Sequence, residues 1–589
     1  MYGYAGRLVH VNLTTNTTSL VALDSNIAKS YLGGSGYACR ILYDLLDFSV
    51  DPLDSRNILV FMTGPLTGTL APCTGRHVVC ARSPLTGFWG ESNSGGYFGA
   101  QLKFAGYDGI VVTGKAAGPI MLHIEDDKVN LLSAEHLWGL DTEKTQSTIR
   151  DDLGPVRVAC IGLAGENLVR FASVVNEERV AARCGMGAVM GSKNLKAVAV
   201  RGTKRPSLQS PEQFRELALS TSRELKEKHR VLGAEGTATY VERGMIANDM
   251  PVKYFQEPEF DVSGLDAKAM ESILVGRKAC YSCPIACGRR VSVPEYSLDD
   301  VAGPEFQTIA AYGSNMLNPD IREVARVNRL CNLYGIDTIS SGSTIALVMD
   351  LCEKGLLDWG IKWGDMDAVA SLIQEIVSRE GKGRALTEGS YRFAKQNGLK
   401  EHVLQVKGME IPNHDPRAYA GLAVVYAVSA RGASHTESDM HTVDIGVDVP
   451  QLGILASDRV TSEGKGVTAA RCQEFRAFHD SMILCHFPQV PPKTMVDLVN
   501  LATGSKYVPD DILRTGSRIV TMKRLFNLKC GFQAKDDALP SRLLQPLKGS
   551  MTEEWVPDFD LQLKEYYEYR NWNKETGVPD DDDIRELVK

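Results

Sequence analysis

The sequence predicts an α+β protein in which an N-terminal antiparallel β domain is followed by two mainly α-helical domains that enclose a cofactor. The chain has 589 residues, whereas one domain usually holds about 100–200, so we expect about three domains. Residues 1–204 form short β-like runs separated by glycine-rich turns, and helical periodicity dominates after residue 210. We place the boundaries at 1–204, 205–410 and 411–589.

The predicted strands of the first domain are runs of β-branched and aliphatic residues. They cover residues 7–13, 57–62, 76–82, 109–113, 120–124, 156–161, 169–175 and 196–200. The first helix opens at Ser210-Pro-Glu-Gln, where a capping serine precedes a proline at the first helical position. Further helices are predicted over 320–334, 341–353, 366–378, 468–484 and 561–569, with long irregular connections suited to lining a cofactor cavity.

Composition and charge exclude several classes of protein. The net charge is −8 and lysine and arginine are scattered, which argues against sequence-independent nucleic-acid binding. No apolar run approaches the roughly 20 residues that span a bilayer. The N-terminus alternates like a strand and lacks a secretion signal, so we expect a cytoplasmic protein with no membrane partner.

Three of the 13 cysteines lie within eight residues, as Cys280-Tyr-Ser-Cys283-Pro-Ile-Ala-Cys287. In a chain without a secretion signal, cysteines serve as thiols and metal ligands rather than disulfides. Structural zinc sites usually carry a second cysteine pair or nearby histidines, which are missing here, so the spacing favours an iron–sulfur cluster. The spacing leaves zinc and coincidence open, and leaves the fourth ligand open among Cys331, Cys352, Cys472, Cys485 and Cys530.

Glycine-rich polar loops in the first domain suit a phosphate group. They are Thr74-Gly-Arg76, Glu91-Ser-Asn-Ser-Gly-Gly96 and Arg183-Cys-Gly-Met-Gly187. Glycines let successive backbone N–H groups turn toward an anion, and an arginine adds a fork of donors. Taken alone, such loops are more often tight turns than phosphate sites.

Together these motifs resemble the aldehyde ferredoxin oxidoreductase family. The resemblance covers nearly the whole chain and rests on Tyr31-Leu-Gly-Gly, Thr63-Gly-Pro-Leu-Thr-Gly, Ser92-Asn-Ser-Gly-Gly, Gly187-Ala-Val-Met-Gly-Ser-Lys-Asn-Leu-Lys-Ala, the three-cysteine loop, Gly303-Pro-Glu, Glu565-Tyr-Tyr-Glu-Tyr-Arg-Asn-Trp-Asn and Thr576-Gly-Val-Pro. It implies one tungsten held between two pterins, with molybdenum as an alternative metal, one [4Fe–4S] cluster, and Mg²⁺ joining the pterin phosphates.

The resemblance also assigns cofactor contacts. It makes Cys485 the fourth cluster ligand and lets two segments, Asn332-Leu-Tyr-Gly-Ile-Asp337 and Asp480-Ser-Met-Ile-Leu484-Cys485, hold one pterin each. Asn332 replaces an aspartate of the family pattern and Ile483 replaces a glycine. The remaining implied contacts are Arg76 between cluster and pterin, Asn93, Gly95, Arg183, Cys184 and Gly185 at the phosphates, and Asn93 with the carbonyl of Cys184 at Mg²⁺.

The resemblance implies oxidation of a small aldehyde and water to a carboxylic acid. Glu305 is the expected general base, with a pKa raised by desolvation, although without the family it would be expected to cap a helix. His435 is the expected donor to the substrate oxygen, with His441 as its rival.

The expected electron acceptor is ferredoxin or an iron–sulfur partner subunit, in a homodimer or in a complex with small electron-transfer subunits. Two alternatives remain. One is an aryl-coenzyme A ring reductase of the same family. The other is a non-catalytic iron–sulfur electron-transfer protein.

Overall fold

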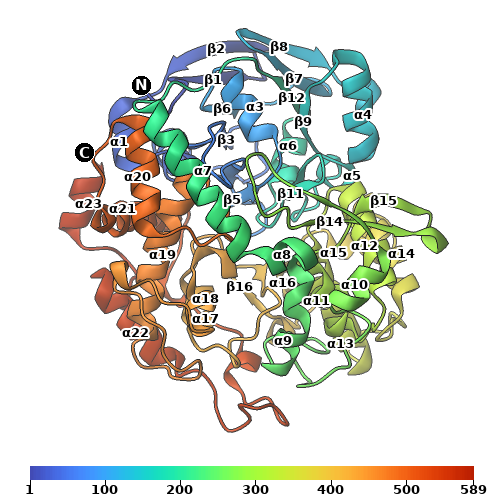
Figure 1. Ribbon diagram of the computed structural model, residues 1–589. Helices are drawn as coiled ribbons and strands as arrows, with labels where there is room; N and C mark the ends of the chain where they lie inside the picture. Colours follow the sequence, from blue (N-terminus) through green and yellow to red (C-terminus); the bar gives the residue numbers. More distant parts are fainter. Residues whose placement is uncertain (589) are drawn as a thin grey trace.

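The computed structural model describes residues 1–588. Two six-stranded sheets from the N-terminal third lie at the top of the view in Figure 1, and most of the helices that follow lie below them. The helix α7 (Pro211–Lys228) runs from the sheets toward the helical part of the molecule. The expected α+β architecture is therefore confirmed.

The first sheet has the strand order β2-β1-β6-β3-β4-β5. Its strands β1 and β6 are parallel, and every other neighbouring pair is antiparallel. In chain order the strands are β1 (Arg7–Asn12), β2 (Thr17–Ala22), β3 (Leu59–Met62), β4 (His77–Arg82), β5 (Trp89–Ser94) and β6 (Gly109–Thr113).

The second sheet has the order β11-β10-β9-β12-β7-β8 and again contains one parallel pair, β7 with β12. Its strands are β7 (Ile120–Glu125), β8 (Lys128–Ser133), β9 (Arg157–Cys160), β10 (Val174–Asn176), β11 (Arg179–Ala181) and β12 (Leu195–Arg201). The two sheets are thus mixed, although most of their strand pairs are antiparallel as expected.

All eight predicted runs overlap a strand, but four strands of these two sheets were not predicted: β2, β5, β8 and β11. Strand β2 is exposed along its whole length, so it lacks the alternation of buried and exposed residues that marks a strand in sequence. Strand β5 is Trp-Gly-Glu-Ser-Asn-Ser and contains little apolar material. Such strands are fixed by their partners rather than by their own composition.

The predicted helices are confirmed with small shifts at their ends. They are α7, α12 (Ile321–Tyr334), α13 (Thr338–Glu353), α14 (Met366–Ser378), α19 (Lys465–Met482) and α22 (Phe559–Arg570). Among the described residues, four helices of at least 12 residues were not predicted: α2 (Gly34–Leu45), α4 (Thr142–Leu153), α20 (Pro492–Thr503) and α21 (Pro509–Lys529). Other helices near the site are α6 (Met186–Ser192) and α11 (Phe306–Tyr312).

A small antiparallel sheet lies within the region expected to be helical. It consists of β13 (Leu274–Lys278), β14 (Gly288–Val293) and β15 (Leu298–Ala302). The three-cysteine loop connects β13 to β14, so the two paired strands fix both ends of that loop.

The main hydrophobic core crosses the sequence-based domain boundaries. One continuous buried cluster includes Val9 from the first sheet, Ile345 from α13 and Trp572 near the C-terminus. Packing on this scale holds loops from distant parts of the chain in fixed positions. Over the described residues no helix is long and apolar enough to cross a membrane.

Candidate cofactor and active site

The cysteines predicted as ligands come together from two distant segments. Cys280, Cys283 and Cys287 lie on the loop between β13 and β14, while Cys485 follows the end of α19. Backbone hydrogen bonds of Cys73 link the two segments. The amide of Cys73 donates to Ser282 O at 2.9 Å, and its carbonyl accepts from the amide of Cys485 at 2.9 Å.

Arg76 contacts both the cysteine site and the glycine-rich loops. Its Nη1 lies 3.8 Å from Cys485 Sγ, its Nε donates to Asn93 Oδ1, and its Nη2 donates to Asn93 O at 3.2 Å. A methyl group at Gly95 would lie only 2.8 Å from Cys280 Sγ. A side chain at position 95 would therefore intrude into the space beside the cysteines.

A cavity of about 280 Å³ lies next to this group. Six of the residues predicted for cofactor binding or catalysis line it: Arg76, Gly95, Arg183, Glu305, Asn332 and Asp337. Arg179, which sequence analysis did not single out, also lines it. The structure thus brings together predicted residues that are up to 261 positions apart in the chain (76 to 337).

The Arg183 segment presents an unpaired donor beside this cavity. Arg183, Cys184 and Gly185 all have positive φ, at 68°, 26° and 76°, and α6 begins directly after them. Arg183 Nη2 donates to Glu410 O at 2.6 Å, whereas Nη1 is buried and has no partner among the described residues. A buried guanidinium N–H without a partner suits an anionic group such as a phosphate.

The two segments assigned to the pterins end helices in the same way. Gly335 follows α12 with φ 69° and ψ 49°, and Ile483 follows α19 with φ 62° and ψ 42°. This left-handed conformation favours glycine, which explains the glycine of the family pattern at position 483. Asp337 then caps α13, since its carboxylate accepts from the amides of Ile339 and Ser340, each at 3.2 Å.

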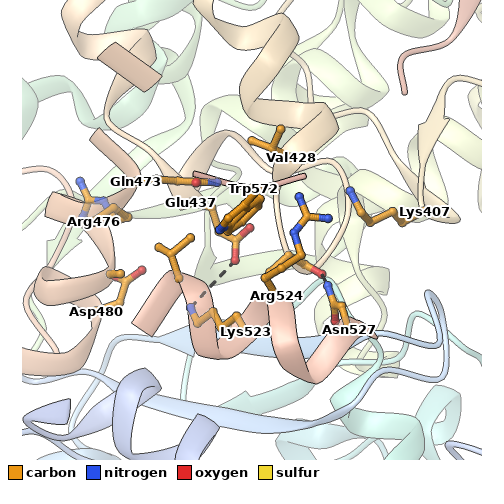
Figure 2. Close-up of a pocket in the computed structure, with 13 residues that line it drawn as sticks. Lys407, Val428, Glu437, Gln473, Arg476, Asp480, Lys523, Arg524, Asn527 and Trp572 are labelled. Carbon is orange, nitrogen blue, oxygen red and sulfur yellow. Dashed lines mark hydrogen bonds and ion pairs between the residues drawn. The ribbon is translucent and has the colours of Figure 1, made fainter. Parts of the chain in front are cut away.

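Asp480 and Leu484 do not line the 280 Å³ cavity. Leu484 is a core residue with 2% of its surface exposed. Figure 2 shows Asp480 at a separate small cavity of about 20 Å³, beside Arg476 and Lys523. There the Nζ of Lys523 lies 4.0 Å from Glu437 Oε1. Burial raises the pKa of the Asp480 carboxyl.

Glu305 occupies the N-cap position of α11, but its side chain does not cap the helix. Its Oε1 instead accepts from Arg179 Nη1 at 3.1 Å, and its Oε2 accepts from the Thr237 hydroxyl at 2.6 Å. The sequence led us to expect a desolvated carboxylate. The structure shows one that is 38% exposed and paired with an arginine.

Near Glu305 lies a group of histidines. The ring of His414 stacks on Phe306 at 5.0 Å and lies 5.1 Å from the ring of His435. His435 forms no hydrogen bond through its ring with any described residue, and burial, followed by the charge of His414, lowers its pKa well below the usual range. Its imidazole is therefore neutral at physiological pH, but His435 does not line the 280 Å³ cavity.

His441, the rival candidate, is held by neighbours. Its Nε2 lies 3.0 Å from the Tyr240 hydroxyl and 3.4 Å from Asp249 Oδ2. The same Asp249 oxygen lies 2.5 Å from His414 Nδ1. Asp249 therefore fixes His414 and His441, and His435 is the histidine that remains available.

Comparison with known proteins fits this arrangement. Residues 8–202 match the N-terminal domain of aldehyde ferredoxin oxidoreductase, and residues 216–588 match domains 2 and 3 of the same enzyme. The chain belongs to the aldehyde ferredoxin oxidoreductase family. It is an oxidoreductase, as the sequence predicts.

Three relatives match this chain along nearly their whole length. The tungsten-containing aldehyde ferredoxin oxidoreductase of Pyrococcus furiosus is 38% identical, over 98% of each chain. The enzyme of the same name from Thermococcus kodakarensis is 37% identical, again over 98% of each chain. A WOR-like subunit of an aliphatic sulfonate oxidoreductase from P. furiosus is 29% identical, over 100% of this chain and 97% of the relative.

One solved structure shares the fold of this chain. The active-site complex BamBC of benzoyl-coenzyme A reductase, bound to 1,5-dienoyl-CoA, superposes with a TM-score of 0.87. It covers 100% of this chain and 97% of that one at 24% sequence identity. At this identity the likeness concerns the fold alone.

Several residues of this site were not predicted from the sequence. Cys73 lies three positions before Arg76, so its place in the same loop was an available clue. Arg179 precedes the Arg183 loop and reaches Glu305 across 126 positions. Asp249 and His414 are 165 positions apart, and nothing in the sequence links them.

Proposed function

We propose that this protein oxidises an aldehyde and water to a carboxylic acid at a tungsten bis-pterin centre, with electrons leaving singly through a [4Fe–4S] cluster. Four cysteines from two distant segments meet beside Arg76, which also lines the 280 Å³ cavity. Full-length relatives named tungsten-containing aldehyde ferredoxin oxidoreductase support the metal and the substrate class.

The residues around the cavity fit the implied cofactors. Cys280, Cys283, Cys287 and Cys485 would hold the cluster, because four thiolates form the usual ligand set of a [4Fe–4S] centre. Arg183 would hold a pterin phosphate with its unpaired Nη1. The pterin contacts proposed for Asn332, Asp337, Asp480 and Leu484 rest on the family resemblance, as do those of Gly95 and Gly185.

The Mg²⁺ site is a proposal built on Asn93 and the carbonyl of Cys184. In the structure Asn93 Oδ1 accepts from Arg76, and the Cys184 carbonyl accepts from the Ser83 hydroxyl at 2.8 Å. A carbonyl oxygen has two lone pairs, so each can accept one hydrogen bond and still coordinate a cation.

The overall reaction is RCHO + H₂O → RCOOH + 2 H⁺ + 2 e⁻. When bound, the tungsten centre would supply a two-electron acceptor, and the cluster held by the four cysteines would supply a one-electron relay. Glu305 takes a proton from water or the hydrated aldehyde, with Arg179 and Thr237 orienting the carboxylate. The neutral ring of His435 donates a hydrogen bond to the substrate oxygen and stabilises the charge that develops there.

The acceptor and the assembly are also proposals. We propose ferredoxin or an iron–sulfur subunit as acceptor, in a homodimer or with small electron-transfer subunits, and molybdenum as an alternative metal. The family name supports ferredoxin. The division into a β-rich domain (1–204) and two helical domains (205–410 and 411–589) also remains a proposal. It rests on the change from strand-like to helical periodicity along the sequence.

Elemental analysis tests the cofactor set. Protein purified anaerobically from cells supplied with both tungstate and molybdate should contain about four iron atoms and one tungsten atom per chain, and should reduce a viologen dye with simple aldehydes. Iron without tungsten or molybdenum, in protein shown to carry pterin, would leave a non-catalytic electron carrier.

The same preparation distinguishes the alternative reaction. An aryl-coenzyme A thioester offered with a low-potential donor should not be reduced. Reduction of the thioester without aldehyde oxidation would assign the protein to the ring reductases.

A further inference from the structure

A fifth cysteine lies within the cluster site. Cys73, on the loop between β3 and β4, has 2% of its surface exposed, and its Sγ lies 3.7 Å from Cys283 Sγ. This separation is typical of a thiol hydrogen bond to sulfur and is far longer than a disulfide bond. All 13 cysteines of the chain are free thiols in the structure.

The backbone fixes Cys73 relative to both halves of the site. Its amide donates to the three-cysteine loop at Ser282, and its carbonyl accepts from Cys485, each at 2.9 Å. Its φ of 63° lies in the left-handed region, which a non-glycine residue adopts only when its surroundings hold it there. The thiol therefore has little freedom to turn away from Cys283.

Cys73 is not needed as an iron ligand, since a [4Fe–4S] cluster takes four protein thiolates and the predicted four are present. Other ligand sulfurs also face donors or positive charge. Arg76 reaches Cys485 at 3.8 Å, and the charge of Arg179 acts on Cys280 and Cys287. Cys73 provides the corresponding donor for Cys283.

We propose that Cys73 donates a thiol hydrogen bond to the cluster ligand Cys283 and thereby raises the reduction potential of the cluster. This inference rests on the [4Fe–4S] cluster of the proposed function. A hydrogen bond to a ligand sulfur stabilises the reduced cluster more than the oxidised one, because the reduced cluster carries one more negative charge. Cys73 is thus a positioning and tuning residue, not a ligand.

The test is a redox titration of the anaerobic holoenzyme, followed by the electron paramagnetic resonance signal of the reduced cluster. Cys73→Ala should keep about four iron atoms per chain and lower the reduced-to-oxidised ratio at a fixed potential about tenfold, equal to 59 mV for a one-electron couple. Cys73→Gly, which tolerates the positive φ, should give the same shift in reduction potential. It serves as the test if the alanine variant does not fold. Cys73→Ser restores a donor and should recover part of the potential.

Cys160→Ala is the matched control. Cys160, on β9 of the second sheet, is another buried thiol, but it donates to Thr142 O at the start of α4 (Thr142–Leu153), so its removal should leave the potential unchanged. Donor-free variants that retain iron and titrate like the wild type would overturn the proposal, as would loss of iron on removal of Cys73 alone. Absence of iron from the wild-type holoenzyme would instead refute the cluster itself.

Discussion

Arg179 Nη1 lies 3.1 Å from Glu305 Oε1, and this contact joins the second sheet of the N-terminal region to the start of α11. The pair faces the cavity that Arg76 and Asp337 also line. Arg179 thus orients the carboxylate that we propose as general base, and its charge also reaches the cysteine site.

Replacing Glu305 with glutamine removes the base but retains an acceptor for Thr237. We expect kcat for aldehyde oxidation to fall about 10²–10⁴-fold, with iron and tungsten contents unchanged. Glu178→Gln is the control, because Glu178 lines the same cavity but pairs with Lys278 and Arg290. Equal activity of the two variants would exclude Glu305 as the base.

The histidine assignment is tested by comparing His435→Ala with His441→Ala. The ring of His435 is free while His441 is held by Tyr240 and Asp249, so we expect the His435 variant to lose about 10²–10³-fold in kcat and the His441 variant to lose less. Steady-state kinetics on metal-loaded protein measure both. Full turnover in both variants would refute a role for either histidine.

Arg183→Met should reduce pterin loading, because it removes the unpaired donor beside the cavity. We expect the tungsten content per chain to fall while the iron content remains, since Arg183 is not a cysteine-site contact. Arg201→Met removes an arginine that pairs with Glu125 at the surface and should leave both metals unaffected. Normal tungsten content in the Arg183 variant would contradict the phosphate assignment.

The buried His479 should make stability depend on pH. Its pKa lies well below 6.5, mainly because of burial and secondly because of Arg476, so the folded state holds it neutral. Stabilisation from the neutral ring is present above pH 6.5 and is lost as the pH falls. We expect wild type to lose about 1.4 kcal/mol relative to His479→Gln between pH 7.5 and 5.5.

Urea midpoints of the two proteins at both pH values measure this difference. The comparison with the variant is needed because burial also raises the pKa of Asp444 to about 6. That carboxyl contributes in the opposite direction, with stability lost as the pH rises toward 6. A constant difference in midpoint would show that His479 does not titrate differently on folding.

Ile483→Gly should destabilise the protein despite removing backbone strain. Relief of the left-handed conformation raises the free energy of unfolding by about 1–2 kcal/mol. Loss of the fully buried isoleucine side chain lowers it by about 2–5 kcal/mol. Gly335→Ala is the reciprocal test, since its Cβ would meet the amide nitrogen of Gly162 at 3.0 Å. A more stable glycine variant at 483 would show that strain dominates.

Helices and strands were predicted well where apolar residues recur at the spacing of that element. The helix over 366–378 matches α14 at both ends, because its apolar residues recur at helical spacing. The small sheet around the cysteine loop was missed, since its strands Leu274–Lys278 and Leu298–Ala302 are half-exposed and rich in charge. Partner strands, rather than composition, determine such segments.

The candidate site could be predicted only where short motifs were linked by a family resemblance. Arg76, Arg183 and Asp337, which were singled out on that basis, line one cavity, and their roles stay predictions. The pairing of Glu305 with Arg179 and that of Asp249 with His414 could not be predicted, because each contact joins distant segments through tertiary packing.

The backbone of Cys73 has a consequence for how the protein matures. It joins the loop at Ser282 to the segment at Cys485 through two hydrogen bonds, so the ligand set is completed only after the first, middle and last parts of the chain have docked. Until Cys485 has been synthesised and has left the ribosome, the chain lacks one of the four proposed cluster ligands. Insertion of the proposed cluster would therefore be a late event in biogenesis, and it would report that all three parts of the chain are in place.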